Sequence, residues 1–321
     1  ISTRGEKYTY DRFFPQLTGF KLDDKWGYDI PPRCFFKRFF RCNNEEDQYL
    51  EMCSDILNRG NIKDDRTGTG TLSLFGKSMR FSLKDGNLPL LTTKKVFLRG
   101  IMEELFFFIS GKTDSKILEE KGVNIWKGNT SREFLDKHGF HSRDIGSIGA
   151  GYSHQWRHAG ADYNGCKEDY TGKGIDQLQN CIDLINNNPD SRRIILNSWN
   201  VTQLDDMSLP PCHVMCQFYC SGDRKLSISM YQRSGDVFLG VPYNIASYSI
   251  LLHMICHITN RVPDEFVYFI GDAHIYKNHV DAVKKQLERS PRGFPTIDIT
   301  RKVDSIDDFK YEDFKLTGYF P

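Results

Sequence analysis

The chain has 321 residues, of which 39% are hydrophobic and 13% aromatic, so it is long enough and apolar enough to bury a substantial core. Its 43 Lys and Arg residues nearly balance its 42 Asp and Glu residues, and this excludes bulk electrostatic attraction to nucleic acid or to an anionic membrane as its basis of function. The nine cysteines are an odd number without a short-spaced framework, which favours a reducing compartment, and we expect a cytoplasmic protein.

Residues 1–45 are aromatic, basic and without hydrophobic period, and we interpret them as an N-terminal extension or an inter-domain junction. No Pro-, Gly- or Ser-rich linker interrupts residues 46–321, which we take as one domain. The longest mostly apolar stretch, residues 244–259, contains Asn, His and Ser and is too short to cross a bilayer. The chain starts with Ile rather than Met, which predicts a fragment or a processed chain.

The first helix is predicted to begin near Glu46. Its apolar face repeats with helical spacing and comprises Tyr49, Leu50, Cys53, Ile56 and Leu57. Gly60 follows as a residue that can end a helix. Residues 71–83 then show the pattern of strands, and we predict a strand pair with a turn near Gly76.

Residues 98–111 are apolar almost all round, which predicts a buried helix. Glu103 and Glu104 are the exceptions in it, and a structural ion pair competes with acid/base chemistry as their explanation. Further along we expect a helical stripe, a strand over 192–199 and a last helix over 272–289. The stripe comprises Ile175, Leu178, Ile182 and Ile185.

Residues 193–233 are rich in strand-forming side chains. In this region HVMCQFYC and KLSISMYQ flank SGDR in the manner of a β-hairpin. Together, the predicted elements indicate the α+β fold class, with a mixed twisted sheet backed by helices.

Three cysteines, Cys212, Cys216 and Cys220, stand four residues apart in LPPCHVMCQFYC. In a strand they would share one face, but positions four apart lie roughly 13 Å from one another, too far for a disulfide or a shared zinc ion. One interpretation is that all three pack; the other is that two pack and Cys212, where two prolines lead into the strand, is a nucleophile. His213 would face the opposite way, so the positive neighbour that activates a thiol must come from elsewhere.

Eight motifs, taken in order, resemble those of the thymidylate synthase family: DDRTGTGTLSLFG, LPLLTTKK, MEEL, QWRH, DSRRI, LPPCH, YQRSGDVFLGVPYNIASYS and GDAHIYKNH. The likeness runs from about Gln48 to Tyr319. It implies a thymidylate synthase-like fold that forms a sheet-to-sheet homodimer. The implied reaction is the reductive methylation of dUMP by 5,10-methylenetetrahydrofolate, giving dTMP and dihydrofolate, without a metal. The likeness extends to the synthase half of a bifunctional dihydrofolate reductase–thymidylate synthase, so a fused reductase domain is compatible with it.

The resemblance implies catalytic roles for five residues. Cys212 matches the cysteine of the family's PPCH motif, whose thiolate adds to carbon 6 of the uracil. Glu104 matches the general acid/base, and a carboxylate on a largely apolar helix is expected to have a raised pKa. Tyr152 matches a tyrosine that helps to remove the carbon-5 proton through water. Arg233 would supply the positive charge near the thiol, and Asp236 completes the set.

The resemblance implies that the dUMP phosphate lies among guanidinium groups, which bind a dianion through strong charge-assisted hydrogen bonds. The ligands from the same subunit would be Arg66, Arg233 and Ser234. Arg192 and Arg193 would come from the other subunit of the homodimer. Such a local cluster would give a basic pocket on a nearly neutral chain.

Three further residues are implied in nucleoside binding. His274 and Tyr276 match residues that bind the sugar hydroxyl. Asn244 offers a donor and an acceptor, which suits the uracil edge, whereas the related deoxycytidylate hydroxymethylases have Asp at this position. A hydroxymethylase of this kind is one alternative function, and a catalytically impaired RNA-binding or regulatory family member is another.

The resemblance also implies a folate site, with side-chain walls, polar contacts to the pterin, an aminobenzoyl pocket and a cation for the glutamyl tail. The walls would be Ile125 and Trp126, and the polar contacts to the pterin would come from Asn129 and Asp236. The aminobenzoyl pocket would be formed by Leu239, Gly240 and Tyr243, and Lys94 would be the cation for the glutamyl tail. The folate itself gives up hydride in this reaction, so no separate nicotinamide is expected.

Overall fold

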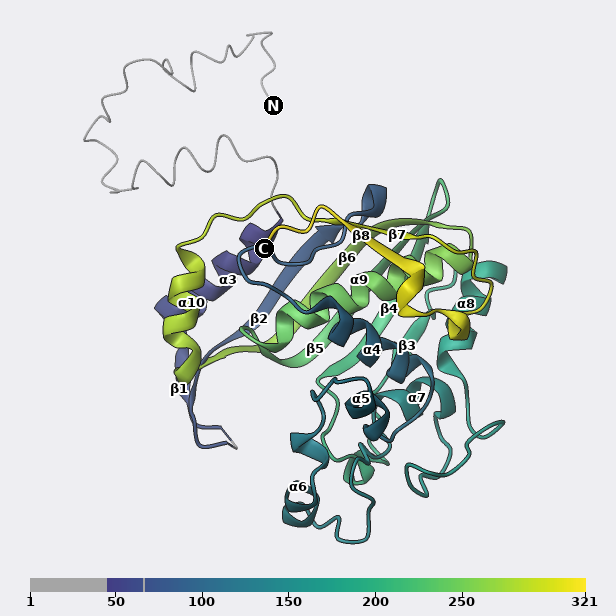
Figure 1. Cartoon of the computed structure of the whole chain (residues 1–321). Helices are drawn as coiled ribbons and strands as arrows, with labels where there is room; N and C mark the ends of the chain where they lie inside the picture. The colour runs from purple at the N-terminus through teal and green to yellow at the C-terminus, as the bar shows by residue number, and fades with distance from the viewer. Residues whose placement is uncertain (1–44, 66) are drawn as a thin grey trace, which may run out of the picture. The chain divides into compact units, whose positions relative to one another are not determined.

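The computed structural model describes residues 45–65 and 67–321 (Figure 1). Arg66 and the predicted N-terminal segment, except for Glu45, lie outside these ranges. The domain boundary predicted at residues 45 and 46 therefore stays a prediction. None of the helices in the described ranges combines the length and the hydrophobicity that crossing a membrane requires.

The main sheet is mixed, as the sequence predicts; it has six strands in the order β1-β2-β6-β5-β4-β3 (Figure 1). Its strands are β1 Asn61–Lys63, β2 Thr71–Ser82, β3 Ile195–Asn197, β4 His213–Ser221, β5 Lys225–Asp236 and β6 Val262–Tyr276. Neighbouring strands are antiparallel except β5 and β6, which run parallel. The carboxyl ends of β5 and β6 and the beginning of β4 therefore meet at one edge of the sheet. A second sheet pairs β7 Thr296–Ile299 with β8 Phe314–Thr317.

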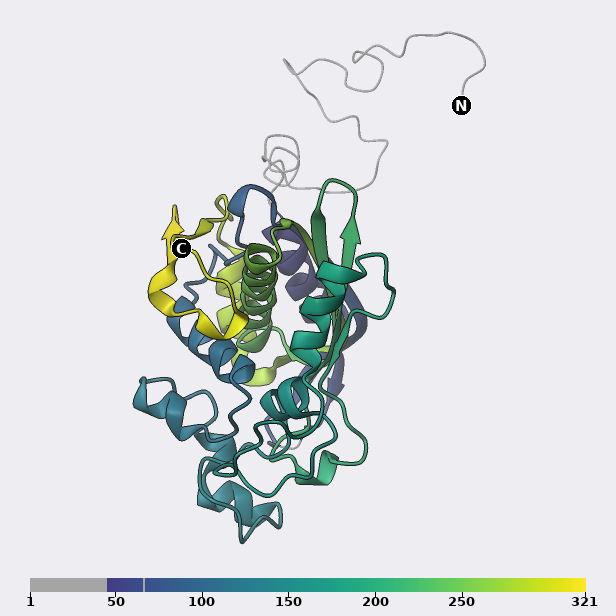
Figure 2. The ribbon, with the colours of Figure 1, turned by 90° about the vertical axis from the view of Figure 1, so that its right-hand side faces the viewer.

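The described helices are α3 Glu46–Arg59, α4 Leu98–Ile109, α5 Lys116–Glu120, α6 Arg132–Lys137, α7 Tyr152–His158, α8 Gln177–Asn187, α9 Gly240–Ile258 and α10 Val280–Leu287. Helix α9 is apolar all round and buried along nearly its whole length, because it lies between the sheet and the C-terminal segment (Figure 2). The sheet face beneath it consists of Leu226, Ile228, Met230, Phe266, Tyr268 and Ile270, all buried. Helix α4 is buried as its composition predicts.

Two predicted elements are wrong. Residues 71–82 form one continuous strand, because β2 keeps the same register with β6 on both sides of Gly76, whose φ of 77° does not reverse the chain. The helix predicted over 272–289 begins only at Val280, because residues up to Tyr276 belong to β6. There, neighbouring strands on both sides supply hydrogen-bond partners.

Two smaller differences concern the elements around β3. The strand predicted over 192–199 is limited to Ile195–Asn197. Ile175 precedes α8 and is exposed, so it does not belong to the apolar stripe, whereas the other three predicted members are buried.

The predicted hairpin of β4 and β5 is present, with Asp223 and Arg224 at positive φ in its turn. Its register shifts between His213 and Met215. As a result His213, rather than Val214, is buried like Cys216. The prediction that the three cysteines share one face is therefore wrong for Cys212, which precedes the shift. An irregularity of this kind changes which side chains point inward.

Candidate active site

Cys212 lies in the turn that leads into β4, and its residue is half-buried. The backbone N–H of Cys212 donates to Tyr152 Oη at 2.7 Å, and the N–H of His213 donates to the same oxygen at 3.3 Å. Tyr152 is the buried first residue of α7, and burial raises the pKa of its phenol well above the ordinary value. One neutral phenol oxygen thus fixes the backbone on both sides of the Cys212 side chain.

Arg233 on β5 is held against the residues that precede β4. Its Nε donates to Pro211 O at 2.9 Å, its Nη2 donates to Pro210 O at 2.8 Å, and its backbone N–H donates to Cys212 O at 2.9 Å. The prolines lack an N–H but keep their carbonyl acceptors, so the PPC segment can bind this guanidinium. The guanidinium carbon also lies 5.5 Å from the ring centroid of Trp199. The structure therefore places a fixed positive charge next to Cys212.

The two adjacent glutamates of α4 have different environments. Glu103 Oε2 accepts from Lys121 Nζ at 2.6 Å, which makes Glu103 a member of an ion pair. Glu104 accepts from the uncharged Trp126 Nε1 at 2.8 Å. Desolvation of the Glu104 carboxyl raises its pKa to about 7, and the Trp126 bond only partly opposes this shift. The competing explanation by an ion pair thus applies to Glu103, whereas Glu104 has the raised pKa that the sequence predicts.

Aromatic rings join Glu104 to the Cys212 region. Trp126, the hydrogen-bond donor to Glu104, has its ring centroid 6.1 Å from that of Tyr152 in an edge-on arrangement. Phe108, one turn along α4 from Glu104, stacks on Tyr152 with centroids 4.8 Å apart. A continuous series of contacts therefore leads from Glu104 through Trp126 and Tyr152 to the backbone of Cys212.

His213 and Asn244 are both buried beside this series. The centroid of the His213 ring lies 5.1 Å from that of Tyr152 and 5.3 Å from that of Tyr248, and its Nδ1 is buried without a hydrogen-bond partner. Burial lowers the pKa of His213 to about 4, an effect that the Asn244 side chain only partly opposes. At neutral pH the imidazole is uncharged. It therefore cannot be the positive neighbour of Cys212.

The parallel pairing of β5 and β6 brings the predicted sugar and phosphate residues together. Ser234 pairs with Asp272, and Asp236 pairs with His274. His274 Nδ1 lies 3.3 Å from Asp272 Oδ1, and its ring contacts that of Tyr276 with centroids 5.3 Å apart. These side chains occupy the same edge of the sheet as the beginning of β4.

The loop that precedes β2 reaches this edge as well. Gly70 O accepts from the N–H of Lys277, the residue after Tyr276, at 3.0 Å. Gly70 has a φ of 77°, a left-handed backbone conformation that glycine adopts without strain. Arg66 itself lies outside the described residues.

Asp236 and Lys94 form a second group, next to the start of α9. Asp236 Oδ1 accepts from the N–H groups of Phe238 and Leu239, at 3.0 Å each. Lys94 Nζ donates to Phe238 O and lies 3.6 Å from the centroid of the Phe238 ring. Burial lowers the pKa of Lys94, and the Asp236 charge opposes that effect. These contacts fix the positions of both charged groups.

The remaining predicted folate residues differ in exposure. Ile125 and Leu239 are exposed apolar side chains, and Asn129 and Gly240 are half-buried. Tyr243 is also half-buried; burial raises its pKa, and a hydrogen bond with the backbone of Phe97 lowers it.

Arg192 and Arg193 are exposed and line a surface hollow of about 460 Å³ beside β3. The carbonyl of Arg192 accepts from Gln217 Nε2 at 3.2 Å, five residues along β4 from Cys212. Arg193 also lines a second hollow, of about 540 Å³, which it shares with Trp199.

Three residues at the site were not singled out by the sequence analysis. Trp199 lies under the Arg233 guanidinium, and Phe108 stacks on Tyr152. Gln232 is buried, donates to Ser234 O at 2.8 Å and accepts from Tyr268 Oη. A polar amide at a core-facing position of a strand was the only available signal for Gln232. The described ranges contain no group of three or more His, Cys, Asp or Glu side chains that could hold a metal ion.

Comparison with protein families matches residues 47–321 to the model described as thymidylate synthase. The chain is 52% identical over 288 residues to the thymidylate synthase of Saccharomyces cerevisiae, covering 87% of this chain and 95% of that protein. It is 56% identical over 274 residues to the human thymidylate synthase, covering 85% of this chain and 87% of that protein. It is also 52% identical over 287 residues to a bifunctional dihydrofolate reductase-thymidylate synthase of Zea mays, covering 89% of this chain but 55% of that protein.

Proposed function

The chain belongs to the thymidylate synthase family, and we propose that it methylates dUMP to dTMP with Cys212 as the nucleophile and 5,10-methylenetetrahydrofolate as cosubstrate. The observation that supports this assignment best is the contact series from Glu104 through Trp126 and Tyr152 to Cys212. In support of the proposal, the series joins a carboxyl group with a pKa of about 7 to the backbone of Cys212, and the Arg233 guanidinium donates to the carbonyls of the two residues before that cysteine.

In the first step the Cys212 sulfur forms a bond to carbon 6 of the uracil, and the π electrons of the 5,6 double bond move to the carbonyl oxygen at carbon 4. Carbon 5 thereby becomes nucleophilic, which divides a difficult substitution into easier steps. The Arg233 guanidinium favours the thiolate form that makes this attack. Tyr152 holds the backbone of the nucleophile, so the sulfur is oriented before the substrate binds.

Glu104 is the general acid/base of the proposal. With a pKa of about 7, its carboxyl populates both the protonated and the ionised form near neutrality. It can therefore donate a proton toward the carbon-4 oxygen and accept one, through water, from the carbon-5 side. Tyr152 assists the second transfer as a hydrogen-bonding group and not as a phenolate, since its pKa is raised.

The nucleotide is held at the edge where β4 begins and β5 and β6 end. In the proposal Arg66, Arg233 and Ser234 bind the phosphate, and His274 and Tyr276 bind the sugar hydroxyl. Asn244, which is buried, pairs with the uracil edge.

The folate residues of the proposal fit a ligand with a flat polar ring, an aromatic middle and an anionic tail. In the proposal Asp236 and Asn129 contact the pterin, and Lys94 faces the tail. Ile125 and Trp126 form the walls, and Leu239, Gly240 and Tyr243 surround the aminobenzoyl part; of these five, Ile125 and Leu239 are exposed apolar side chains. The bound 5,10-methylenetetrahydrofolate supplies the one-carbon unit and the reducing hydride. What the chain contributes is a site that orients this ligand and excludes water around Glu104.

The direct test is a spectrophotometric assay for dihydrofolate with the purified chain, dUMP and 5,10-methylenetetrahydrofolate. We expect dihydrofolate and dTMP in equal amounts. Product from dCMP without dihydrofolate would instead assign a hydroxymethylase, because hydroxymethylation leaves the folate unoxidised. Absence of turnover with both nucleotides would favour the impaired, regulatory alternative. The fused reductase and the cytoplasmic location stay predictions.

The proposal includes a homodimer formed through the sheet face opposite α9. This face carries exposed apolar side chains on four neighbouring strands, namely Ile195, Tyr219, Tyr231 and Phe269. Tyr231 and Phe269 are directly paired across β5 and β6, so the exposed apolar surface is continuous there. A second copy is the occupant that we propose, because it would also bring Arg192 and Arg193 to a phosphate site that one subunit leaves incomplete.

Complementation between inactive variants tests the shared site. Cys212→Ser and the double variant Arg192→Ala/Arg193→Ala are each expected to be nearly inactive alone. Unfolding and refolding a 1:1 mixture should restore about a quarter of the wild-type activity, since half of the dimers are mixed and each has one intact site. A mixture that stays inactive while a dimer is seen by sedimentation would contradict donation of the arginines across the interface.

A further inference from the structure

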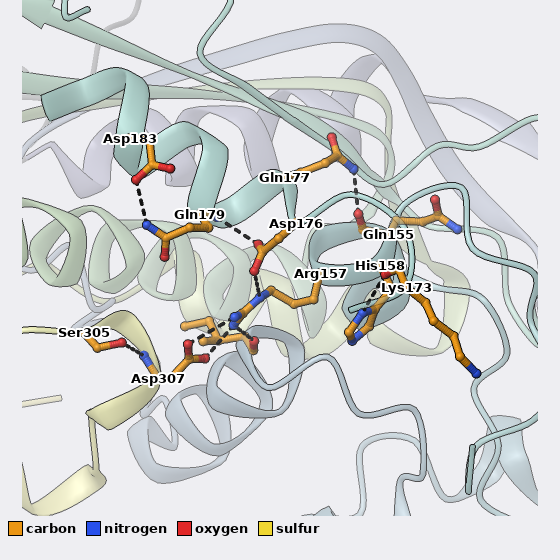
Figure 3. Close-up of polar contacts among 11 residues, drawn as sticks. Gln155, Arg157, His158, Lys173, Asp176, Gln177, Gln179, Asp183, Ser305 and Asp307 are labelled. Atoms are coloured by element: carbon orange, nitrogen blue, oxygen red, sulfur yellow. Dashed lines mark hydrogen bonds and ion pairs between the residues drawn. The ribbon is translucent and has the colours of Figure 1, made fainter. Parts of the chain in front are cut away.

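A cluster of polar contacts surrounds Arg157, the sixth residue of α7. The arginine side chain is only 15% exposed, whereas those of Asp176 and Asp307 are 35% and 47% exposed. Nε donates to Asp176 Oδ2 at 3.0 Å, and Nη1 and Nη2 donate to the two carboxylate oxygens of Asp307 at 2.5 and 3.1 Å. Nη1 also donates to Ile109 O at 2.5 Å. Figure 3 shows the guanidinium pointing between the two aspartates.

The partners of Arg157 come from three other parts of the fold. Ile109 is the last residue of α4. Asp176 is the N-cap of α8, where its second oxygen accepts from the N–H of Gln179 at 2.9 Å. Asp307 lies in the short helix Ile306–Asp308 of the C-terminal segment. One side chain of α7 therefore ties together α4, α8 and this segment.

Hydrogen bonds and opposite charges both favour this junction. Burial lowers the pKa of Arg157, but the hydrogen bonds and charges of Asp307 and Asp176 outweigh burial, and the net shift is upward. A planar guanidinium can donate to three groups in different directions at once, whereas a lysine ammonium on a flexible stem cannot hold all three in this geometry. Removal of the cation would leave two carboxylates close together without their partner.

The residues of the junction lie the same number of residues along α4 and α7 from the proposed reacting groups. Glu104 precedes Ile109 by five residues in α4, and Tyr152 precedes Arg157 by five residues in α7. Five residues correspond to roughly 7.5 Å of helix rise. Between these levels Phe108 stacks on Tyr152. A shift of α7 relative to α4 at Arg157 would therefore move Tyr152 relative to Glu104.

We propose that Arg157 is a positioning residue for the reaction: it sets the distance between the Glu104 carboxyl and the Cys212 backbone that Tyr152 holds. The inference rests on the proposed function and assigns a role at that same site to a residue that does not touch it. Misplacement of a reacting group by about 1 Å can lower a rate by about 100-fold, so a loose junction has a measurable effect.

The test compares Arg157→Gln and Arg157→Lys with Arg301→Gln. Arg301 is a matched control because it makes a similar two-point contact, to Asp313 at 2.6 and 2.8 Å, in the same C-terminal segment. Its described partners are Asp313 and Asp308, so it does not join α4 to α7. Active sites are counted by covalent labelling with 5-fluorodeoxyuridylate in the presence of 5,10-methylenetetrahydrofolate, so that unfolded protein does not enter kcat.

For Arg157→Gln we expect kcat per labelled site to fall about 10- to 100-fold, with KM for dUMP within about twofold of wild type. The pH limb assigned to Glu104 should move to lower pH, because water that enters a loosened site lowers the pKa of a carboxyl that burial had raised. Arg157→Lys should recover only part of the rate, and Arg301→Gln should match wild type in both measurements.

The inference would be overturned if Arg157→Gln kept the wild-type pH limb and the wild-type kcat per labelled site and showed only a lower Tm. Arg157 would then have a structural role alone. An equal kinetic loss in Arg301→Gln would also overturn it. If Arg157→Gln does not fold, Asp307→Asn keeps the Asp176 contact and should show the same changes at smaller size; unchanged kinetics there would likewise overturn the inference. Failure of wild type to convert dUMP would instead refute the proposed function.

Discussion

Cys212→Ser is expected to abolish thymidylate formation, with kcat lowered by at least about 10⁴-fold. The hydroxyl of serine ionises far less readily than a thiol, and the nearby Arg233 charge cannot compensate for that difference. Steady-state assay of dihydrofolate formation gives the rate. Intact-mass measurement after incubation with 5-fluorodeoxyuridylate and 5,10-methylenetetrahydrofolate gives the adduct, which should be present in wild type and absent in the variant.

Cys220→Ser is the matched control for this prediction. Cys220 lies on β4, the strand that follows Cys212, and is half-buried, so the exchange of sulfur for oxygen is tolerable there. Cys216 is a poor control because it is buried, and desolvation raises the pKa of its thiol well above the ordinary value. An adduct that persists in Cys212→Ser and maps to another cysteine would assign the nucleophile elsewhere.

The elements that the sequence predicts correctly are those whose local pattern agrees with their surroundings. Residues 98–111 are apolar all round because α4 is enclosed, and the β4–β5 hairpin carries its own turn signal. Residues 272–276 are different, because their state depends on partners distant in sequence. Asp236 and Ser73 flank His274 in the sheet, and no local periodicity contains that information.

The types of residue at the candidate site could be predicted from ordered motifs, but their contacts could not. Arg233 binds the carbonyls of Pro210 and Pro211, more than 20 residues away, and this contact exists only because β4 and β5 are paired. The register shift after His213 is equally invisible in the sequence, although it decides that the imidazole is buried and uncharged. For Arg193 neither the sequence pattern nor the structure of a single chain can test the role, because the proposed contact is with the phosphate site of a second copy.

Glu104→Gln carries the second large effect, a fall in kcat of about 10²- to 10⁴-fold, which is typical for loss of a general acid/base. The amide oxygen can still accept from Trp126 Nε1, so the local geometry is preserved while proton transfer is lost. The pH profile of kcat/KM for wild type should contain an ionisation near 7, and the variant should lack it. Glu103→Gln is the control: it removes an ion pair with Lys121 and should change kcat only a few-fold.

The same variant makes a prediction about stability whose sign follows from the raised pKa. The Glu104 carboxyl has a pKa of about 7 in the folded chain against an ordinary value of 4.5, so between these values the folded state holds a proton that the unfolded state has released. Stability from this group is therefore lost as the pH rises from about 4.5 to about 7. Glutamine does not titrate, so the Tm of Glu104→Gln relative to wild type should be higher at pH 8 than at pH 4, as measured by calorimetry at both values.

A Tm difference that does not change with pH, together with a retained ionisation near 7, would show that another group titrates in the wild-type profile. The two results together separate catalysis from folding. If the carboxylate were merely structural, its replacement would lower the stability of the protein at high pH. If the carboxyl is kept desolvated for proton transfer, its replacement should raise that stability. A slower and more stable variant at pH 8 is thus the combined outcome that the environment of Glu104 predicts.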